Sequence, residues 1–246
     1  MRVASIFIFL ASLTLSTQAS VPQQQAERLS QDLTPLGSER AGNKDGSIPA
    51  WTGGLSSIPA GLGYVKGEHL PDPYPDDQPI FRVDASNADT HDAYITRGQK
   101  ALMERHDTYF LDVYPTRRTC ANPEHVYKAS AKNAVVGELV ANGNGVAEAI
   151  MASPFPIPNN GLEIVWNHTL RYRSHKLQRE FTAIPVNQSG DYYEITVHDD
   201  AIFNWSDPQM SRAEDLNNVS ILYLLQTKAP ARSAGVVVLV QETLNM

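Results

Sequence analysis

Two stretches near the C-terminus decide the fold: REFTAIPVNQSGDYYEITVHDD (residues 179–200) and SILYLLQTKAPARSAGVVVLVQETL (residues 220–244). In both, apolar side chains recur with the period of two that places them on one face of a β-strand. Each stretch is interrupted by a turn, at residues 187–190 and 230–234, where Asn, Gly, Ser and Pro favour chain reversal. The pattern predicts two hairpins, and therefore an antiparallel meander.

Immediately upstream, NNGLEIVWNHTLRYR (residues 159–173) has the best helical periodicity of the chain. The spacing of one helix face is met by Leu162, Val165, Trp166, Thr169, Leu170 and Arg173. Asn160 and Glu163 stand at the positions of an N-terminal capping box. We therefore predict a helix over residues 162–173 whose apolar stripe, with Trp166, packs against the sheet.

Weaker patterns precede this helix. They predict a helix over about residues 89–106, a strand within TYFLDVYP (residues 108–115), a helix that begins at Asn122-Pro123, and a hairpin around residues 142–145. Taken with the meander, they predict an α+β domain over residues 90–246, with helices packed on a curved antiparallel sheet.

Residues 20–89 have a different composition. Proline and glycine punctuate the segment, and LPDPYPDDQP (residues 70–79) contains four prolines, which exclude a helix or a central strand there. The segment also carries Trp51, Tyr64, Phe81 and other apolar side chains, more than a disordered spacer requires. We predict an extended arm that wraps over a folded body.

The first residues predict export. Arg2, an apolar run over residues 6–15 and small residues before Ser20 match a secretory signal peptide over residues 1–19. The run is shorter than the roughly 20 residues that span a bilayer, so we expect no transmembrane segment in the mature chain. The net charge of −7 disfavours binding to nucleic acid. Cys120 is the single cysteine and cannot form an internal disulfide.

Few residues suggest chemistry. AGNKDGSIPAWT (residues 41–52) resembles a calcium loop, but Ala41 and Thr52 occupy positions that need ligand oxygens, so we interpret it as a turn. His198, Asp199 and Asp200 are the one compact cluster of acids and imidazole; they could serve a hydrolase or form a solvated turn. We predict no catalytic residue, no metal and no cofactor.

A basic stretch follows the predicted helix, with Arg171, Arg173, Lys176 and Arg179 in an otherwise acidic protein. These residues could meet an anionic headgroup or an acidic partner. They could equally provide favourable charge at the C-terminus of the helix.

Four strings identify a family resemblance: residues 26–54, YPTRRTCANPEHVY (114–127), PFPIPNNGLEIVWNH (154–168) and DDAIFNWSDP (199–208). From about Ala26 to its end, the chain resembles the bacterial family known as domain of unknown function 1329. The resemblance implies an envelope protein of Gram-negative bacteria, encoded beside membrane permeases, with a fold similar to the periplasmic lipoprotein carriers. In that fold a curved sheet wraps around helices and can enclose a hydrophobic cavity. The resemblance brings no catalytic residues.

We therefore expect a periplasmic protein, or one on the periplasmic face of the outer membrane, that binds or carries a hydrophobic, lipid-like molecule. A membrane permease is the partner that the resemblance implies. A hydrolase and a protein-interaction module are the alternatives. The candidate ligand-binding residues are Phe155, Trp166, Leu170, Arg171 and Arg173. Trp166 could instead be plain core. Family members are nearly twice this length, so we also expect a truncated chain whose last apolar strand lacks a partner and promotes aggregation.

Overall fold

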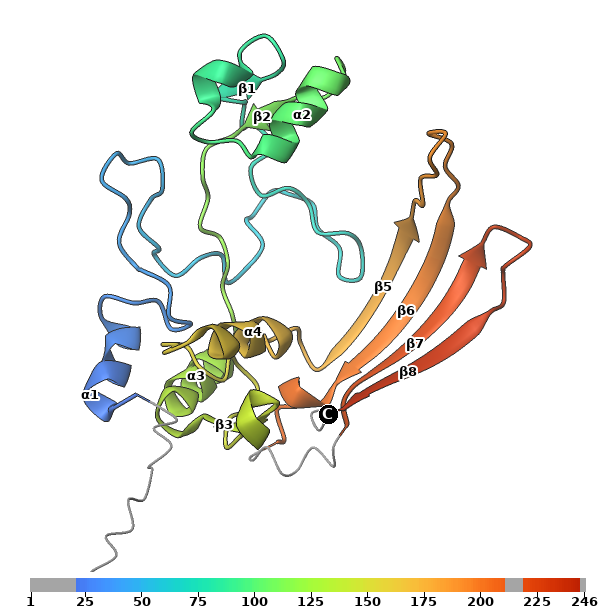
Figure 1. Ribbon diagram of the computed structural model, residues 1–246. Coiled ribbons are helices and arrows are strands. Elements are labelled where there is room, and N and C mark those ends of the chain that lie inside the picture. The colour runs from blue at the N-terminus through green and yellow to red at the C-terminus, as the bar shows by residue number, and fades with distance from the viewer. Residues whose placement is uncertain (1–20, 211–218, 244–246) are drawn as a thin grey trace, which may run out of the picture. The chain divides into compact units, whose positions relative to one another are not determined.

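The computed structural model describes residues 21–210 and 219–243 (Figure 1). Its contacts divide the chain into two compact units, which we treat separately. The loop unit is Leu29–Glu124, and the sheet unit combines Met1–Arg28 with His125–Met246. The boundary expected between residues 89 and 90 falls inside the loop unit. The expected signal peptide lies outside the described residues. None of the helices in the described ranges is long and apolar enough to cross a membrane.

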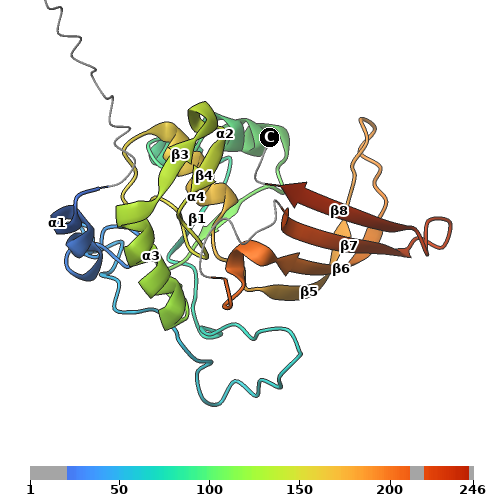
Figure 2. The same ribbon diagram turned by 90° about the horizontal axis from the view of Figure 1, so that it is seen from below.

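The sheet unit contains the predicted meander. Its strands are β5 (Lys176–Ala183), β6 (Ile195–Phe203), β7 (Val219–Ala229) and β8 (Val237–Thr243). They pair in sequence order with every neighbour antiparallel, in a curved sheet (Figures 1 and 2). Both hairpins, and with them the α+β class, are confirmed. In the described residues, β8 pairs with β7 alone.

The register sorts the side chains of the sheet onto two faces, because directly opposed residues of antiparallel strands point the same way. The Phe203 face carries Leu177, Arg179 and Phe181 from β5, Val197, Asp199, Ala201 and Phe203 from β6, Ile221, Tyr223 and Leu225 from β7, and Val238 and Val240 from β8. The His198 face carries Gln178, Glu180, His198, Asp200, Ile202, Leu222, Leu224, Val237 and Leu239. On both faces the side chains become more exposed toward the hairpin tips. Phe181, on the Phe203 face, is 40% exposed, and Leu239, on the His198 face, is 68% exposed.

The helices of the sheet unit are α1 (Gln23–Ala26), α3 (Glu124–Val136) and α4 (Gly161–Thr169). β3 (Glu138–Val140) and β4 (Gly145–Ala147) form the predicted hairpin. Asn133 of α3 is 1% exposed, donates its amide to the carbonyl of Ile150 and accepts from the amide of the same residue. The loop that leads to α4 is thereby fixed to α3.

The loop unit has little regular structure. β1 (Phe81–Val83) pairs with β2 (Leu111–Val113). Between them lie one 3-10 turn, η2 (Ala88–His91), and one α-helix, α2 (Arg97–Arg105). The single helix predicted over 89–106 is wrong, because η2 ends at His91 and Thr96 starts a separate helix. Its hydroxyl accepts from the backbone N–H of Gln99, whose side chain accepts in return from the N–H of Thr96.

The buried centre of the loop unit is small. Val83, Ala88 and Met103 form one cluster of buried apolar side chains. Residues 31–80 contain turns and an isolated Leu33–Glu39 bridge, without a helix or a longer strand. These residues must therefore be held by contacts other than a backbone ladder.

Candidate functional site

Three of the five predicted ligand-binding residues form part of a core. Phe155, Trp166 and Leu170 are 4%, 8% and 3% exposed, and they pack together in a cluster completed by Val146, Ala149 and Trp205. The indole Nε1 of Trp166 donates to the carbonyl of Gly143 at 2.9 Å. The structure thus brings these three side chains together, and their apolar surfaces are covered by one another and by the rest of the cluster.

Asn167, which is half-buried, holds one member of this cluster in place, and periodicity does not reveal it. Its side-chain amide donates to the carbonyl of Phe155 at 2.6 Å and accepts from the N–H of Phe155 at 2.8 Å. The pair locks Phe155 onto α4. An amide that satisfies both backbone groups of one distant residue leaves no repeating pattern in the sequence.

The predicted stripe of α4 is wrong in part. Leu162 and Val165 are 52% and 60% exposed, and the buried face is made by Glu163 and Trp166, with Leu170 just after the helix. Glu163 is buried because its carboxylate accepts from the side chain of Asn160, whose own oxygen caps the Glu163 N–H. This capping exchange turns Glu163 inward and displaces the apolar side chains beside it.

The two predicted arginines follow α4, which ends at Thr169. Arg171 is exposed and donates to the carbonyl of His168, so it closes its own turn. Arg173 reaches the Phe203 face, where its guanidinium lies 5.5 Å from the ring centroid of Phe203. The structure therefore separates two neighbours that the sequence groups together.

The His198–Asp200 cluster is divided by the pleat of β6. His198 and Asp200 share one face, with Nε2 and Oδ2 3.4 Å apart. Asp199 lies on the other face, fully buried, and accepts from Nε of Arg179 at 2.7 Å. The three groups do not converge on one point, which a hydrolytic site built from all of them would need.

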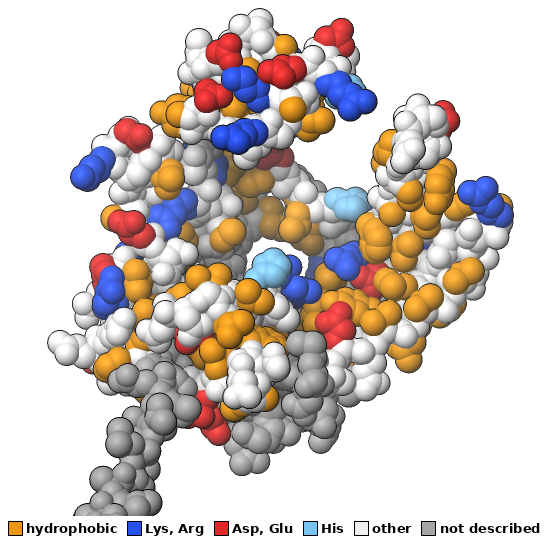
Figure 3. Space-filling model, in the orientation of Figure 1, with side chains coloured by type: hydrophobic (Ala, Val, Ile, Leu, Met, Phe, Trp, Pro, Cys, Tyr) orange, Lys and Arg blue, Asp and Glu red, His pale blue; other side chains and the backbone are white. Residues whose placement is uncertain are grey.

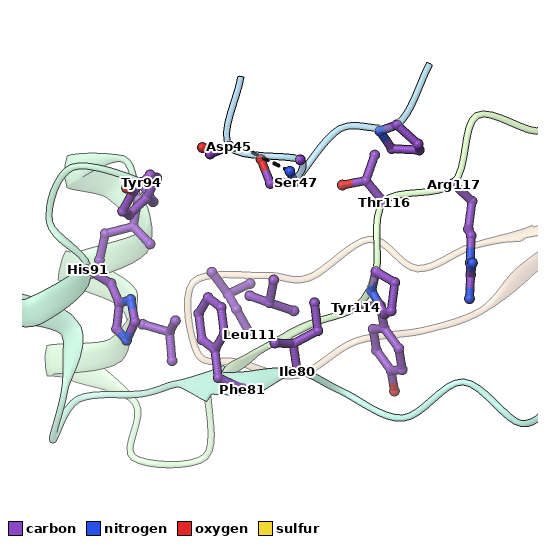
Figure 4. A pocket seen from close by; sticks show the side chains of 16 residues that line it. Asp45, Ser47, Ile80, Phe81, His91, Tyr94, Leu111, Tyr114, Thr116 and Arg117 are labelled. Carbon is purple, nitrogen blue, oxygen red and sulfur yellow. Dashed lines mark hydrogen bonds between the residues drawn. The ribbon is translucent and has the colours of Figure 1, made fainter. Parts of the chain in front are cut away.

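A cavity of about 800 Å³ lies within the loop unit (Figure 4). Its floor is apolar and comes from β1 and β2, with Ile80 and Phe81 beside Leu111 and Val113. Phe81 stacks on His91 of η2, with ring centroids 4.8 Å apart and nearly parallel planes. Because β1 and β2 are adjacent, two short strands suffice to build a continuous aromatic and aliphatic surface.

The other walls come from three connecting segments. Tyr94 and Ile95 close one side, Tyr114 and Arg117 close the opposite side, and a turn that includes Asp45 and Ser47 lies across the cavity from the floor (Figure 4). The Tyr94 and Tyr114 side chains are 86% and 50% exposed. Their aromatic surfaces are therefore available at the rim.

The turn is the AGNKDG stretch that resembles a calcium loop. Asn43 uses its side chain to accept from the N–H of Ile48, and Asp45 accepts from the N–H of Ser47. Gly46 has φ +76°, a conformation that favours glycine. The acidic and amide oxygens are thus occupied in closing the turn. In the described residues, no group of three potential metal ligands occurs.

Arg118 fixes this turn from a distant part of the sequence. Its guanidinium donates to the carbonyls of Glu39, Arg40, Ala41 and Pro49, at 2.7 to 3.3 Å. Trp51 extends the attachment, since its indole donates to the carbonyl of Cys120 at 3.0 Å and its ring lies under Arg40. Trp51 therefore anchors the signature stretch to the segment that carries Arg118.

Charged groups around the cavity are mostly paired. The N–H of Ser47 lowers the pKa of Asp45, which keeps its carboxylate ionised at neutral pH. Asp77 raises the pKa of Arg117 through two short hydrogen bonds. On the opposite side of the β1–β2 pair, Arg82 is bound to Asp112 in the same way and lowers the pKa of that carboxyl. The apolar floor is thus bordered by charges that already have partners.

The chain is similar to a known family of proteins and to one curated bacterial protein. A family model described as "Protein of unknown function (DUF1329)" matches residues 82–246. The chain belongs to this family. It is also 41% identical over 239 residues to the Uncharacterized protein PA3922 of Pseudomonas aeruginosa. The resemblance drawn from the four strings is therefore confirmed.

The match covers 96% of this chain and 51% of the relative, so the chain spans about half the length of that DUF1329 protein. No solved structure matches the chain. The likeness to lipoprotein carriers consequently stays a prediction.

Proposed function

We propose that this DUF1329 chain is an exported envelope protein of a Gram-negative bacterium that binds or carries a hydrophobic, lipid-like molecule, together with a membrane permease. The observation that carries the proposal is the cavity of about 800 Å³ in the loop unit. Ligand pockets of 300 to 1,000 Å³ lined mainly by apolar and aromatic side chains are typical of small-molecule sites. Export is supported by the pattern of residues 1–19.

Binding without turnover is the form of this function that the geometry favours. Arg117 and Ser47, which line the cavity, are engaged with partners that hold the walls in place. The His198–Asp200 groups are divided between the two faces of the sheet. Neither place offers a nucleophile beside an oriented base, which covalent hydrolysis by a side chain requires.

The test is binding of N-phenyl-1-naphthylamine, an uncharged dye whose emission rises in apolar surroundings. Ile80 lines the cavity and is 63% exposed, so Ile80→Asp should fold while placing a charge on the floor. We expect its dye affinity to fall at least about tenfold, a loss of about 1.4 kcal/mol. Ile58→Asp, a half-exposed isoleucine away from the cavity, is the matched control.

Equal dye binding by both variants and the wild type would show that the cavity is not the site. For the biological ligand, the protein would be recovered from the periplasmic fraction and its bound lipids identified by mass spectrometry. Mass spectrometry of the intact protein from the same preparation would give its N-terminus, which we expect at Ser20. Material that retained Met1 would contradict export by a cleaved signal.

A further inference from the structure

Arg173 differs from the other basic residues that follow α4. Arg171 closes its own turn, Lys176 is exposed on the opposite face of the sheet from Phe203, and Arg179 is paired with Asp199. Arg173 has no carboxylate within ion-pair distance among the described residues. Of the four cations in the basic stretch, Arg173 is half-buried and faces Phe203 without a carboxylate partner among the residues that the structure describes.

The contacts of Arg173 are weak. One terminal nitrogen lies 3.4 Å from the hydroxyl of Tyr223, the limit of a hydrogen bond, and the guanidinium lies over the ring of Phe203. Its Nε is buried and has no hydrogen-bond partner within residues 21–210 and 219–243. A buried polar group without a partner is uncommon in native proteins, and a buried charge is normally paired. An anion bound at this guanidinium would supply the acceptor that Nε needs.

The surface that continues from Arg173 is apolar except for the Arg179–Asp199 ion pair, which lies on the same face of β5 and β6. Phe203 and Ile221 are 4% and 5% exposed, and Leu177 and Tyr223 pack on them. Along the strands the same face continues through Leu225, Val197, Val240, Phe181 and Val238, and exposure rises to 46% at Val238. Figure 3 shows hydrophobic side chains gathered over the sheet. A positive group thus stands at the covered end of an apolar track that opens toward the hairpin tips.

We propose that the Phe203 face binds a single-chain amphiphile with an acidic head, with the carboxylate or phosphate on Arg173 and Tyr223 and the acyl chain along the track. A guanidinium suits this role because its planar fork matches both anions. The inference rests on the proposed function only in that the ligand is lipid-like. The site lies in the sheet unit and is separate from the cavity of the loop unit.

The test measures affinity by calorimetry with delipidated full chain and three probes that share an oleoyl tail: oleate, oleoyl lysophosphatidate and uncharged monooleoylglycerol. We expect at least one acid to bind the wild type tenfold or more tighter than the uncharged probe. Arg173→Gln should remove that preference and change monooleoylglycerol binding less than twofold. Tyr223→Phe should weaken the acid less than Arg173→Gln does. Lys228→Gln, which removes an exposed cation from the same sheet, should change nothing.

The two acids separate the sources of the anion: tighter oleate indicates a fatty acid, and tighter lysophosphatidate indicates a phospholipid head. If Arg173→Gln does not fold, Arg173→Lys replaces it, because it keeps the charge and loses the fork. We then expect at least a threefold loss for the preferred acid and none for monooleoylglycerol.

The proposal is overturned if the Arg173 variant, Gln or Lys, binds the acids like the wild type. It is equally overturned if that variant weakens the binding of all three probes to the same extent. It is also overturned if the wild type binds the acids no tighter than monooleoylglycerol. Dye binding in the cavity with no preference for acids would leave the proposed function intact and remove this inference. If Arg173→Gln abolishes a preference for acids but the wild type does not bind the dye, this inference stands and the cavity is not the binding site.

Discussion

The sheet unit buries aromatic side chains against one another, whereas the loop unit attaches long connecting segments through hydrogen bonds from side chains to backbone carbonyls. Trp166 and Phe155 exemplify the first arrangement, and Arg118 with its four carbonyl acceptors exemplifies the second. The first depends on shape and apolar area, so truncating a side chain leaves a hole. The second depends on direction and charge, so water can replace part of what a substitution removes. Stability and binding should therefore respond differently in the two units.

The largest effect is expected at Trp166. Trp166→Ala removes a buried indole and its bond to Gly143, and should lower the free energy of unfolding by about 3–5 kcal/mol. Val165→Ala, at the next position and 60% exposed, should cost less than about 0.5 kcal/mol. Urea denaturation followed by circular dichroism would measure both. Similar small losses in the two variants would mean that the indole faces a void or a ligand.

A smaller effect on stability, with a larger one on local order, is expected at Arg118. Its acceptors are mostly solvent-accessible, so Arg118→Ala should cost about 1 kcal/mol overall. Hydrogen exchange over residues 39–51 should nevertheless accelerate, since the segment loses its attachment. Arg97→Ala, an exposed arginine of the same unit, serves as control. Unchanged exchange in Arg118→Ala would show that Trp51 alone holds the turn.

The smallest effect is the pH response of the Arg82–Asp112 pair. Arg82 lowers the pKa of Asp112 in the folded state, so the pair stabilises the protein above the unfolded carboxyl value near 4. That contribution is lost as pH falls through the lower, folded value. Asp112→Asn should therefore be less stable than the wild type at neutral pH, and the difference should shrink below about pH 4. Thermal melting of both proteins over a series of pH values would measure this difference in stability. A difference that stays constant with pH would rule out the ion pair as its cause.

The sequence predicted the parts of the fold that repeat. Residues 176–203 and 219–243 alternate with a period of two over whole strands, so both hairpins, their turns and their order could be foreseen. The stripe of α4 was predicted less well because Glu163, capped by Asn160, turns inward where an apolar neighbour was expected. A local hydrogen bond there outweighs the preference of Val165 for burial.

The cavity could not be predicted by such patterns. It forms where residues 45–49, 80–83 and 91–117 meet, and the bonds that bring them together connect positions about 70 to 80 residues apart. Arg118 gave no periodic signal, and it was recognisable only as part of the string YPTRRTC. Phe155, Trp166 and Leu170 were correctly grouped, yet the sequence alone did not distinguish packing from a ligand site.

The long reach of Arg118 also sets an order of events during synthesis. The carbonyls of residues 39–49 leave the ribosome 69 to 79 residues before the guanidinium that binds them. At about 5–20 residues per second, that interval lasts roughly 3–16 s. During this time the turn can form its own hydrogen bonds, at Ser47 and Ile48, but lacks its attachment to Arg118. The cavity closes only once residue 118 has been made, however early its other parts were translated.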